Sequence, residues 1–346
     1  VLSSSAHPAF LKAMHFLNVK AVVIPTKKDF SFDLDSFEKA INANTILLIG
    51  SAPNYPTGMM DPIESLSKLA VDNGLLLHVD ACIGGFLLAY LKKIGKDIPL
   101  FDFKLSGVTS LSVDLHKYAY APKGSSVLLY RKEELRKEQF SVYPNWEGGV
   151  YGSTTFLGTK PGGIVASTWM ALNHIGQDGY VKLTHKTIDA TKVISDYIQN
   201  SKDLSLIGTP IMSLLAFNSN KHDIYHIADL LSEKGWYIGR LQNPPGIHLV
   251  VSQIHADGAA KELVEDMEEL LEKLNTSTIK NKLSKVGDNL SVNAVKSLGY
   301  KSLKKAVVAS TGSKNSKKRL IYDLKSSLDL DQSNDLFKSI LNRFYQ

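Results

Sequence analysis

The feature that most restricts the possible fold is a strand–helix–strand pattern in the first quarter of the chain. Residues 45–50 form a continuous apolar run of strand length, which is typical of a strand covered on both faces. A helix is predicted to follow, with Asp61 as N-cap, Pro62 in the first turn and Glu64 at the capping-box position. Residues 75–80 are the next strand. The two strands are therefore expected to be parallel and joined by a right-handed crossover.

The neighbouring segments extend this pattern. The predicted helix carries a buried stripe and ends at Gly74, a residue suited to the C′ position: Ile63, Leu66, Leu69 and Ala70 form the stripe. Further strands are predicted at 21–25, 110–113 and 125–130, and helices after Pro8 and at 35–42. This alternation predicts a layered α/β domain with a mainly parallel sheet, in which ligands bind beyond the carboxyl ends of the strands.

The second half of the chain predicts a smaller α+β domain, with helices and strands at 178–199, 211–217, 223–234, 248–254 and 259–274. Residues 143–163 are rich in Gly, Pro, Ser and Thr and are expected to form a functional loop, because they also contain aromatic residues. We therefore divide the chain into a partial large domain (1–163), a small domain (164–275) and a tail (276–346).

The charge of the chain is concentrated in that tail. From Thr276 onward there are fourteen lysines and arginines against five acidic residues, whereas the whole chain has 40 against 34. The tail lacks interleaved aromatic residues, so we expect a solvated segment with one amphipathic helix near 334–345 and no nucleic-acid site. The longest apolar run, near 83–91, is far shorter than the about 20 residues that span a bilayer. Cys82 is the only cysteine, which excludes an internal disulfide.

Asp80 and Lys117 are the strongest candidates for chemistry. Each follows the end of a predicted strand, which places both at the ligand-binding edge of the sheet. Taken singly, Lys117 is most often a surface lysine and Asp80 a helix N-cap. Together they favour a Schiff-base lysine for pyridoxal phosphate and a carboxylate that keeps the pyridine nitrogen protonated. Such a lysine attacks only as the neutral amine, so we expect apolar or cationic surroundings for Lys117, including the adjacent His116.

Other residues are ambiguous by themselves. His7 either stacks on a cofactor ring or caps the first helix, residues 54–58 suit an ordinary turn, and Lys123 and His116 either bind phosphate or are solvated. Competing chemistries lack their motifs: there is no GxGxxG after a strand, no Walker loop and no GxSxG elbow. His222 and His226 have helical spacing without a convincing third ligand, so no metal is expected.

Four segments closely resemble the sphingosine-1-phosphate lyase branch of the group II pyridoxal-phosphate-dependent decarboxylases, a family of fold type I. They are HVDACIGGF from His78, SVDLHKYAYAPKGSS from Ser112, KPGG from Lys160 and QNPPGIH from Gln242. The pairing of HVDA with HK is shared by the whole decarboxylase group, whereas the longer motifs around these residues indicate the lyase branch. The similarity runs over about residues 5–274, and the tail does not match.

The resemblance implies a role for each candidate residue. Lys117 would carry pyridoxal 5′-phosphate, Asp80 would hold the ring nitrogen, and His7 would stack over the ring. His116 and Lys123 would lie near phosphate groups, Lys123 near that of the substrate. Thr159 would reach a cofactor phosphate across a dimer interface.

The resemblance also implies an activity: retro-aldol cleavage of phosphorylated sphingoid bases to a long-chain aldehyde and phosphoethanolamine, in sphingolipid metabolism. The enzyme would be a homodimer with shared active sites on the cytosolic face of the endoplasmic reticulum membrane. The family's membrane anchor and a phosphate-gripping glycine loop would precede Val1. The alternatives are an amino-acid decarboxylase of the same group and an inactive fragment or pseudoenzyme.

Overall fold

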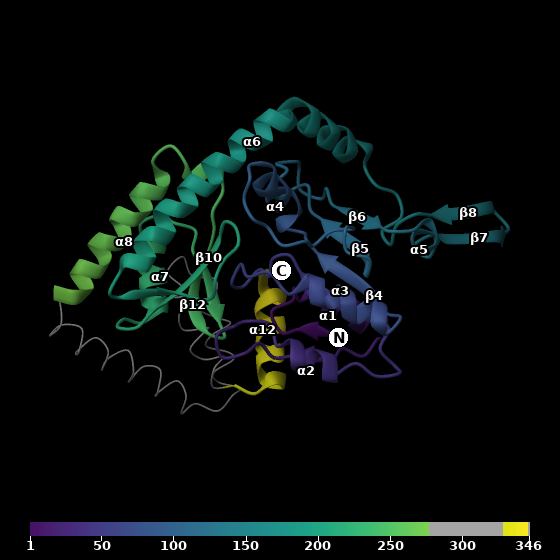
Figure 1. The fold of residues 1–346 in the computed structure, drawn as a ribbon, viewed down its shortest axis with the longest axis horizontal. Helices are drawn as coiled ribbons and strands as arrows, with labels where there is room; N and C mark the ends of the chain where they lie inside the picture. Colours follow the sequence, from purple (N-terminus) through teal and green to yellow (C-terminus); the bar gives the residue numbers. More distant parts are fainter. Residues whose placement is uncertain (277–327, 345–346) are drawn as a thin grey trace. The chain divides into compact units, whose positions relative to one another are not determined.

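The fold is described from a computed structural model that covers residues 1–276 and 328–344 (Figure 1). Its main sheet has the strand order β3-β4-β5-β6. Strands β3 (Leu47–Ser51), β4 (Leu76–Asp80) and β5 (Val108–Val113) are parallel, and β6 (Val127–Tyr130) is antiparallel to β5. The predicted parallel pair is therefore confirmed.

The first residues of the chain extend this sheet. β1 (Leu2–Ser3) and β2 (Val23–Ile24) form a parallel pair. The Val1 backbone donates to the Leu47 carbonyl at 2.8 Å and accepts from the Ile49 amide at 3.1 Å, which is the pattern of parallel neighbours. The carboxyl ends of β1, β3, β4 and β5 consequently lie at one edge.

Helices α1 (Ala9–Phe16), α2 (Leu34–Lys39), α3 (Ile63–Asp72) and α4 (Gly84–Lys93) connect these strands, and the short helix α5 (Glu133–Lys137) follows β6. α3 packs against β3, where Ile63 and Leu66 leave no room for a side chain at Gly50. α4 packs against β5 in the same way, with Gly85 facing Val113. The predicted stripe of α3 is largely confirmed, since Ile63, Leu66 and Ala70 are buried, and Gly74 has the positive φ of 64° expected of a C′ glycine.

The start of α3 differs from the prediction at Asp61. The N-cap is Pro62 and makes no side-chain capping bond, whereas Asp61 points into the protein and is 3% exposed. Its Oδ2 accepts a hydrogen bond from the Ser51 amide at 2.7 Å, at the end of β3. A carboxylate that bonds this strand end is not available to the first turn of the helix, so the N-cap prediction was wrong.

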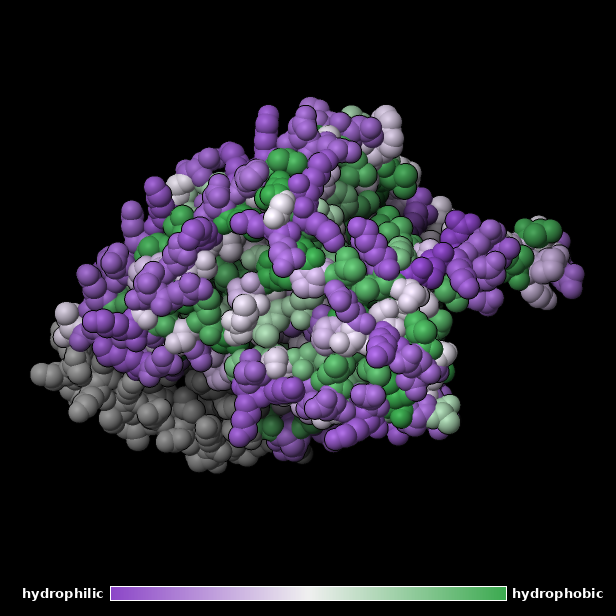
Figure 2. Space-filling model, in the orientation of Figure 1, coloured by the Kyte–Doolittle hydropathy of each residue, from purple (hydrophilic) through white to green (hydrophobic). Residues whose placement is uncertain are grey.

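Residues 143–163 were predicted to be a loop, but part of this segment forms strands. β7 (Ser141–Trp146) and β8 (Gly149–Ser153) form an antiparallel hairpin that projects from the sheet's unit, with apolar side chains at its tip (Figures 1 and 2). The Trp146–Tyr151 ring contact supports it, at a centroid distance of 6.3 Å. Helix α6 (Gly162–Asn200) follows, with a break at Gly176, where φ is 60° and ψ is 178°. It includes the helix predicted at 178–199.

The later elements are β9 (Leu204–Leu206), β10 (Leu214–Ser219), α7 (Ile224–Glu233), β11 (Gly239–Gln242), β12 (Pro245–Val250), the short 3₁₀ helix η1 (Gln253–His255), α8 (Ala259–Thr276) and α12 (Leu330–Phe344). The strands form a sheet of order β11-β12-β10-β9. The strand predicted at 248–254 was misplaced: β12 begins at Pro245, where it pairs with β11, and ends at Val250. Asp223 caps α7 by accepting from the Tyr225 amide at 2.9 Å.

Contacts divide the chain into two compact units. The first consists of residues 1–196, 206–216 and 249–260, and the second of 197–205, 217–248 and the described residues from 261 onward. The domain boundaries predicted at 163 and 275 stay a prediction. The helix predicted at 334–345 corresponds to α12, although Tyr345 lies outside the described residues, as does the tail from 277 to 327. Within the described residues, no helix is long and apolar enough to span a membrane.

Candidate active site

Asp80 ends β4 at the carboxyl edge of the main sheet. It is 6% exposed, and its Oδ1 accepts hydrogen bonds from the Cys82 amide at 3.0 Å and from the Ser112 hydroxyl at 3.1 Å. Ser112 is its register partner on β5, so the parallel pairing itself brings the hydroxyl to the carboxylate. A buried carboxylate requires such donors, because removing it from water without them is costly.

Lys117 lies in the turn that follows β5 and is half-buried. Its Nζ donates to Cys82 Sγ at 3.0 Å and lies 3.0 Å from Asp114 Oδ2. Burial favours a lower pKa for Lys117, but the Cys82 thiol and the Asp114 carboxylate outweigh it and raise the pKa above its usual range. The expected burial of Lys117 is therefore found in part, whereas its closest charged neighbour is the Asp114 carboxylate rather than a cationic group.

His116 is fixed beside the same turn. Its Nδ1 donates to the Ser125 carbonyl at 2.7 Å, and its Nε2 lies 3.6 Å from Asp114 Oδ2. The Ser125 hydroxyl is buried and has no hydrogen-bond partner among the described residues. An unpaired buried hydroxyl is uncommon in proteins and indicates a place where a further polar group can bind.

The sequence did not identify three residues that lie near Asp80 or Lys117: Cys82, Asp114 and Asp61. Cys82 bonds both Asp80, through its amide, and Lys117, through its sulfur. The spacing of Asp114 and Lys117, three residues apart in a turn, was a signal for their contact. Burial, together with Asp80, raises the pKa of the Cys82 thiol to about 12, so this group remains protonated. Asp61 could not be distinguished from a helix cap by its sequence context.

In the part of the chain that the structure describes, the remaining predicted residues form no hydrogen bond or ion pair with Asp80 or Lys117. His7 is exposed beyond the end of β1, and its Nδ1 accepts from the Ala9 amide at 3.2 Å, in the manner of a helix cap. Lys123 is exposed in the loop before β6, and Thr159 is exposed between the hairpin and α6. Residues 54–58 form the expected turn, in which Asn54 Oδ1 accepts from the Thr57 amide at 3.0 Å.

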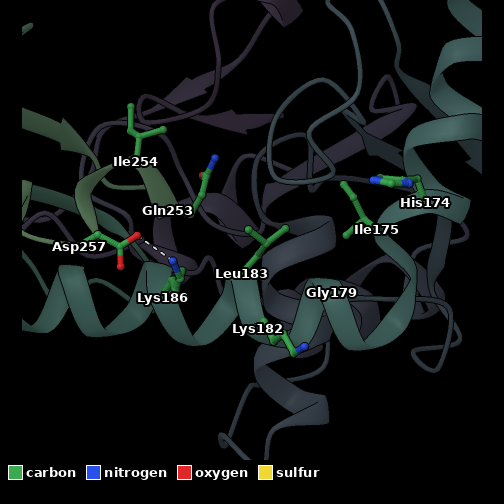
Figure 3. Close-up of a pocket in the computed structure, with 9 residues that line it drawn as sticks. All are labelled: His174, Ile175, Gly179, Lys182, Leu183, Lys186, Gln253, Ile254 and Asp257. Carbon is green, nitrogen blue, oxygen red and sulfur yellow. Dashed lines mark hydrogen bonds and ion pairs between the residues drawn. The ribbon is translucent and has the colours of Figure 1, made fainter.

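A separate pocket of about 490 Å³ lies along α6 (Figure 3). α6 contributes His174, Lys182 and Lys186, and the segment around η1 contributes Gln253 and Asp257. Lys186 forms an ion pair with Asp257 at 2.7 Å. The lining includes none of the predicted site residues. Among the described residues, no cluster of His, Cys, Asp and Glu could hold a metal ion.

Curated relatives are similar to most of this chain. It is 41% identical over 272 residues to the sphingosine-1-phosphate lyase of Arabidopsis thaliana, covering 79% of this chain and 50% of that protein. It is 43% identical over 256 residues to sphingosine-1-phosphate lyase 1 of Rattus norvegicus, covering 74% of this chain and 45% of that protein. The chain thus spans about half the length of these relatives.

Solved structures confirm the fold. A sphingosine-1-phosphate lyase of Burkholderia pseudomallei superposes with a TM-score of 0.77 at 37% identity, covering 83% of this chain and 66% of that one. Glutamate decarboxylase of Lactobacillus brevis superposes with a TM-score of 0.69 at 20% identity, covering 79% of this chain and 65% of that one, and supports the fold alone. The predicted α/β fold of type I is confirmed by these likenesses.

The family model for the pyridoxal-dependent decarboxylase conserved domain matches residues 1–220. This range contains β1 to β10 and includes both Asp80 and Lys117. The chain belongs to the pyridoxal-dependent decarboxylase family.

Proposed function

We propose that this chain carries the Schiff-base lysine and the ring-nitrogen carboxylate of a pyridoxal-phosphate-dependent lyase that cleaves phosphorylated sphingoid bases. The products are a long-chain aldehyde and phosphoethanolamine. The observation that carries the proposal is the contact of Cys82 with both Asp80 and Lys117, which places the carboxylate and the amine on either side of one residue. The names of the relatives at 41% and 43% identity support the choice of substrate.

The residues present fit the cofactor. The family is pyridoxal-dependent, so the cofactor is pyridoxal 5′-phosphate. When bound, this group supplies an electron sink for cleavage of a bond to the carbon that bears the amine. Asp80 is buried and has a carboxyl group that can accept a hydrogen bond from the ring N–H, and Lys117 supplies the amine for covalent attachment. The His116 ring lies near the same Asp114 oxygen as the Lys117 amine, and the Ser125 hydroxyl, whose carbonyl accepts from His116, is a further polar group in this loop.

In this proposal each residue has a defined task. Asp80 would hold a proton on the ring nitrogen, and Lys117 would carry the cofactor. Lys123 and Thr159, both exposed, are proposed to reach phosphate oxygens of substrate and cofactor, and His7 to cover the ring. The endoplasmic reticulum location remains a prediction from the resemblance.

We also propose that the enzyme is a homodimer and that the β7–β8 hairpin is part of its interface. The hairpin exposes Val142 (63%), Tyr143 (57%), Trp146 (55%) and Val150 (78%). Contiguous exposed apolar side chains of this kind mark interaction sites. The double substitution Tyr143→Ser with Trp146→Ser is expected to shift the sedimentation of the protein toward the monomer. Tyr237→Ser, which alters another highly exposed aromatic residue, serves as the control.

The activity is tested by separating the two enzyme classes through their products. Sphingosine 1-phosphate and candidate amino acids are each supplied with the cofactor, and long-chain aldehyde and carbon dioxide are both measured. Aldehyde without carbon dioxide is expected. Carbon dioxide from an amino acid would instead indicate a decarboxylase. An intact-length protein with neither product and no cofactor absorbance would indicate a pseudoenzyme.

A further inference from the structure

The amine of Lys117 is held from two sides by groups on different segments. Asp114 Oδ2, in the same turn, and Cys82 Sγ, after β4, each lie 3.0 Å from its Nζ. Two close contacts on one flexible side chain restrict it to a narrow range of rotamers. This arrangement specifies where the nitrogen lies when nothing is bonded to it.

Both holding groups are themselves fixed. Asp114 Oδ1 accepts from the Ser126 hydroxyl at 2.6 Å, which fixes the carboxylate plane. The Asp114 amide donates to the Cys82 carbonyl at 3.0 Å, so the two segments are bonded through their backbones as well. The Cys82 amide in turn donates to Asp80. The position of the Lys117 amine is thereby coupled to that of the carboxylate at the end of β4.

We propose that Asp114 and Cys82 are positioning residues that hold Lys117 as an ammonium ion whenever its amine is not covalently bonded. This inference rests on the role proposed above for Lys117. The charged or titratable groups around that amine are Asp114 and His116 in its own turn, Asp80 at the end of β4 and Cys82 just after it. The thiol stays protonated, so Asp114 supplies the negative charge and Cys82 supplies a hydrogen-bond acceptor. The amine reacts with an electrophile only after losing a proton, so its reactivity rises with pH.

The test measures the reactivity of Lys117 without any cofactor. The full chain, freed of bound aldehydes with hydroxylamine and dialysed, is labelled with a trace of acetic anhydride between pH 7 and pH 11. Peptide mass spectrometry then follows Lys117, with the exposed Lys123 as internal reference. At a pH below the pKa of Lys117 in both the wild type and the variant, only a small fraction of the amine is neutral. A substitution that lowers this pKa by one unit therefore makes the labelling of Lys117 about tenfold faster.

Asp114→Asn is expected to label Lys117 at least about threefold faster at pH 8 than the wild type, with Lys123 unchanged. Cys82→Ala is also expected to make the labelling of Lys117 faster at a given pH. Cys82→Ser is expected to restore the wild-type rate, because a hydroxyl can again accept the hydrogen bond. Asp97→Asn, at an exposed site, is the matched control. Circular dichroism verifies that each variant is folded; if Asp114→Asn does not fold, the two Cys82 variants decide. Superimposable Lys117 profiles in the folded variants and the wild type would overturn the proposal. The test is independent of the proposed function, because it requires neither cofactor binding nor turnover.

Discussion

Asp61 is a buried carboxyl group whose ionisation is expected to lower the stability of the fold. Burial raises the pKa of Asp61 from 3.8 to about 7. Hydrogen bonds from Ser51 and Asn54 oppose this increase, and the nearby charge of Asp80 adds to it. In the unfolded chain the same group titrates near its ordinary value. Between about pH 4 and pH 7 the unfolded chain therefore loses a proton that the folded protein retains.

The sign and size of the effect follow from this difference. Where the unfolded state binds fewer protons, the free energy of unfolding falls as pH rises. At about 1.4 kcal/mol per pKa unit, a difference of about 3 units amounts to about 4 kcal/mol, of which about 2.5 kcal/mol falls between pH 5 and pH 8. Asp61→Asn does not titrate, and its amide oxygen can still accept from the Ser51 amide.

The assay is urea-induced unfolding of the wild type, Asp61→Asn and the exposed-site control Asp97→Asn at several pH values. The free energy of unfolding of Asp61→Asn, relative to that of the wild type, is expected to increase by about 2.5 kcal/mol from pH 5 to pH 8. The control is expected to remain parallel to the wild type. A constant difference between Asp61→Asn and the wild type across this range would refute the reasoning, because it would mean that Asp61 is already ionised in the folded protein at pH 5.

Two further predictions concern packing next to the site. The buried Tyr118 hydroxyl donates to the Val251 carbonyl at 2.7 Å and lies 2.6 Å from the Ser213 hydroxyl. Tyr118→Phe should therefore cost about 1–3 kcal/mol in urea unfolding, against no change for Tyr237→Phe at an exposed site. An equal effect of both substitutions would contradict this. A Cβ at Gly84 would overlap the Ala52 carbonyl oxygen, so Gly84→Ala should cost about 1–3 kcal/mol, whereas Gly152→Ala, which faces open space, should be nearly neutral. A neutral Gly84→Ala would show that α4 can move away from the Ala52 carbonyl.

Local patterns were sufficient to predict the parallel core. The apolar runs that became β3 and β4, and the stripe of α3, have the correct period and length, because burial on both sides of a parallel strand leaves few other solutions. The pairing of Asp80 with the Lys117 turn also followed from this topology. Two strands of the smaller sheet, β9 and β11, were missed because they have only three and four residues and their stability depends on pairing with neighbours.

The electrostatics of the site could not be predicted in the same way. The direction of the pKa shift of Lys117 depends on the side-chain positions of Asp114 and Cys82, and Cys82 lies 35 residues earlier in the chain. Asp61 has the sequence context of an N-cap, and only the packing of α3 against β3 turns its carboxyl group inward. Long-range side-chain contacts of this kind have no periodic signal.

Covalent trapping of the cofactor identifies the lysine that carries it. The chain is incubated with pyridoxal 5′-phosphate, reduced with borohydride and digested, and the labelled lysine is located by mass spectrometry. We expect the cofactor mass on Lys117. Lys117→Ala is expected to abolish this label together with the visible absorbance of the bound cofactor, and Asp80→Asn to shift the absorbance. A label on another lysine, or undiminished labelling and absorbance in Lys117→Ala, would contradict it.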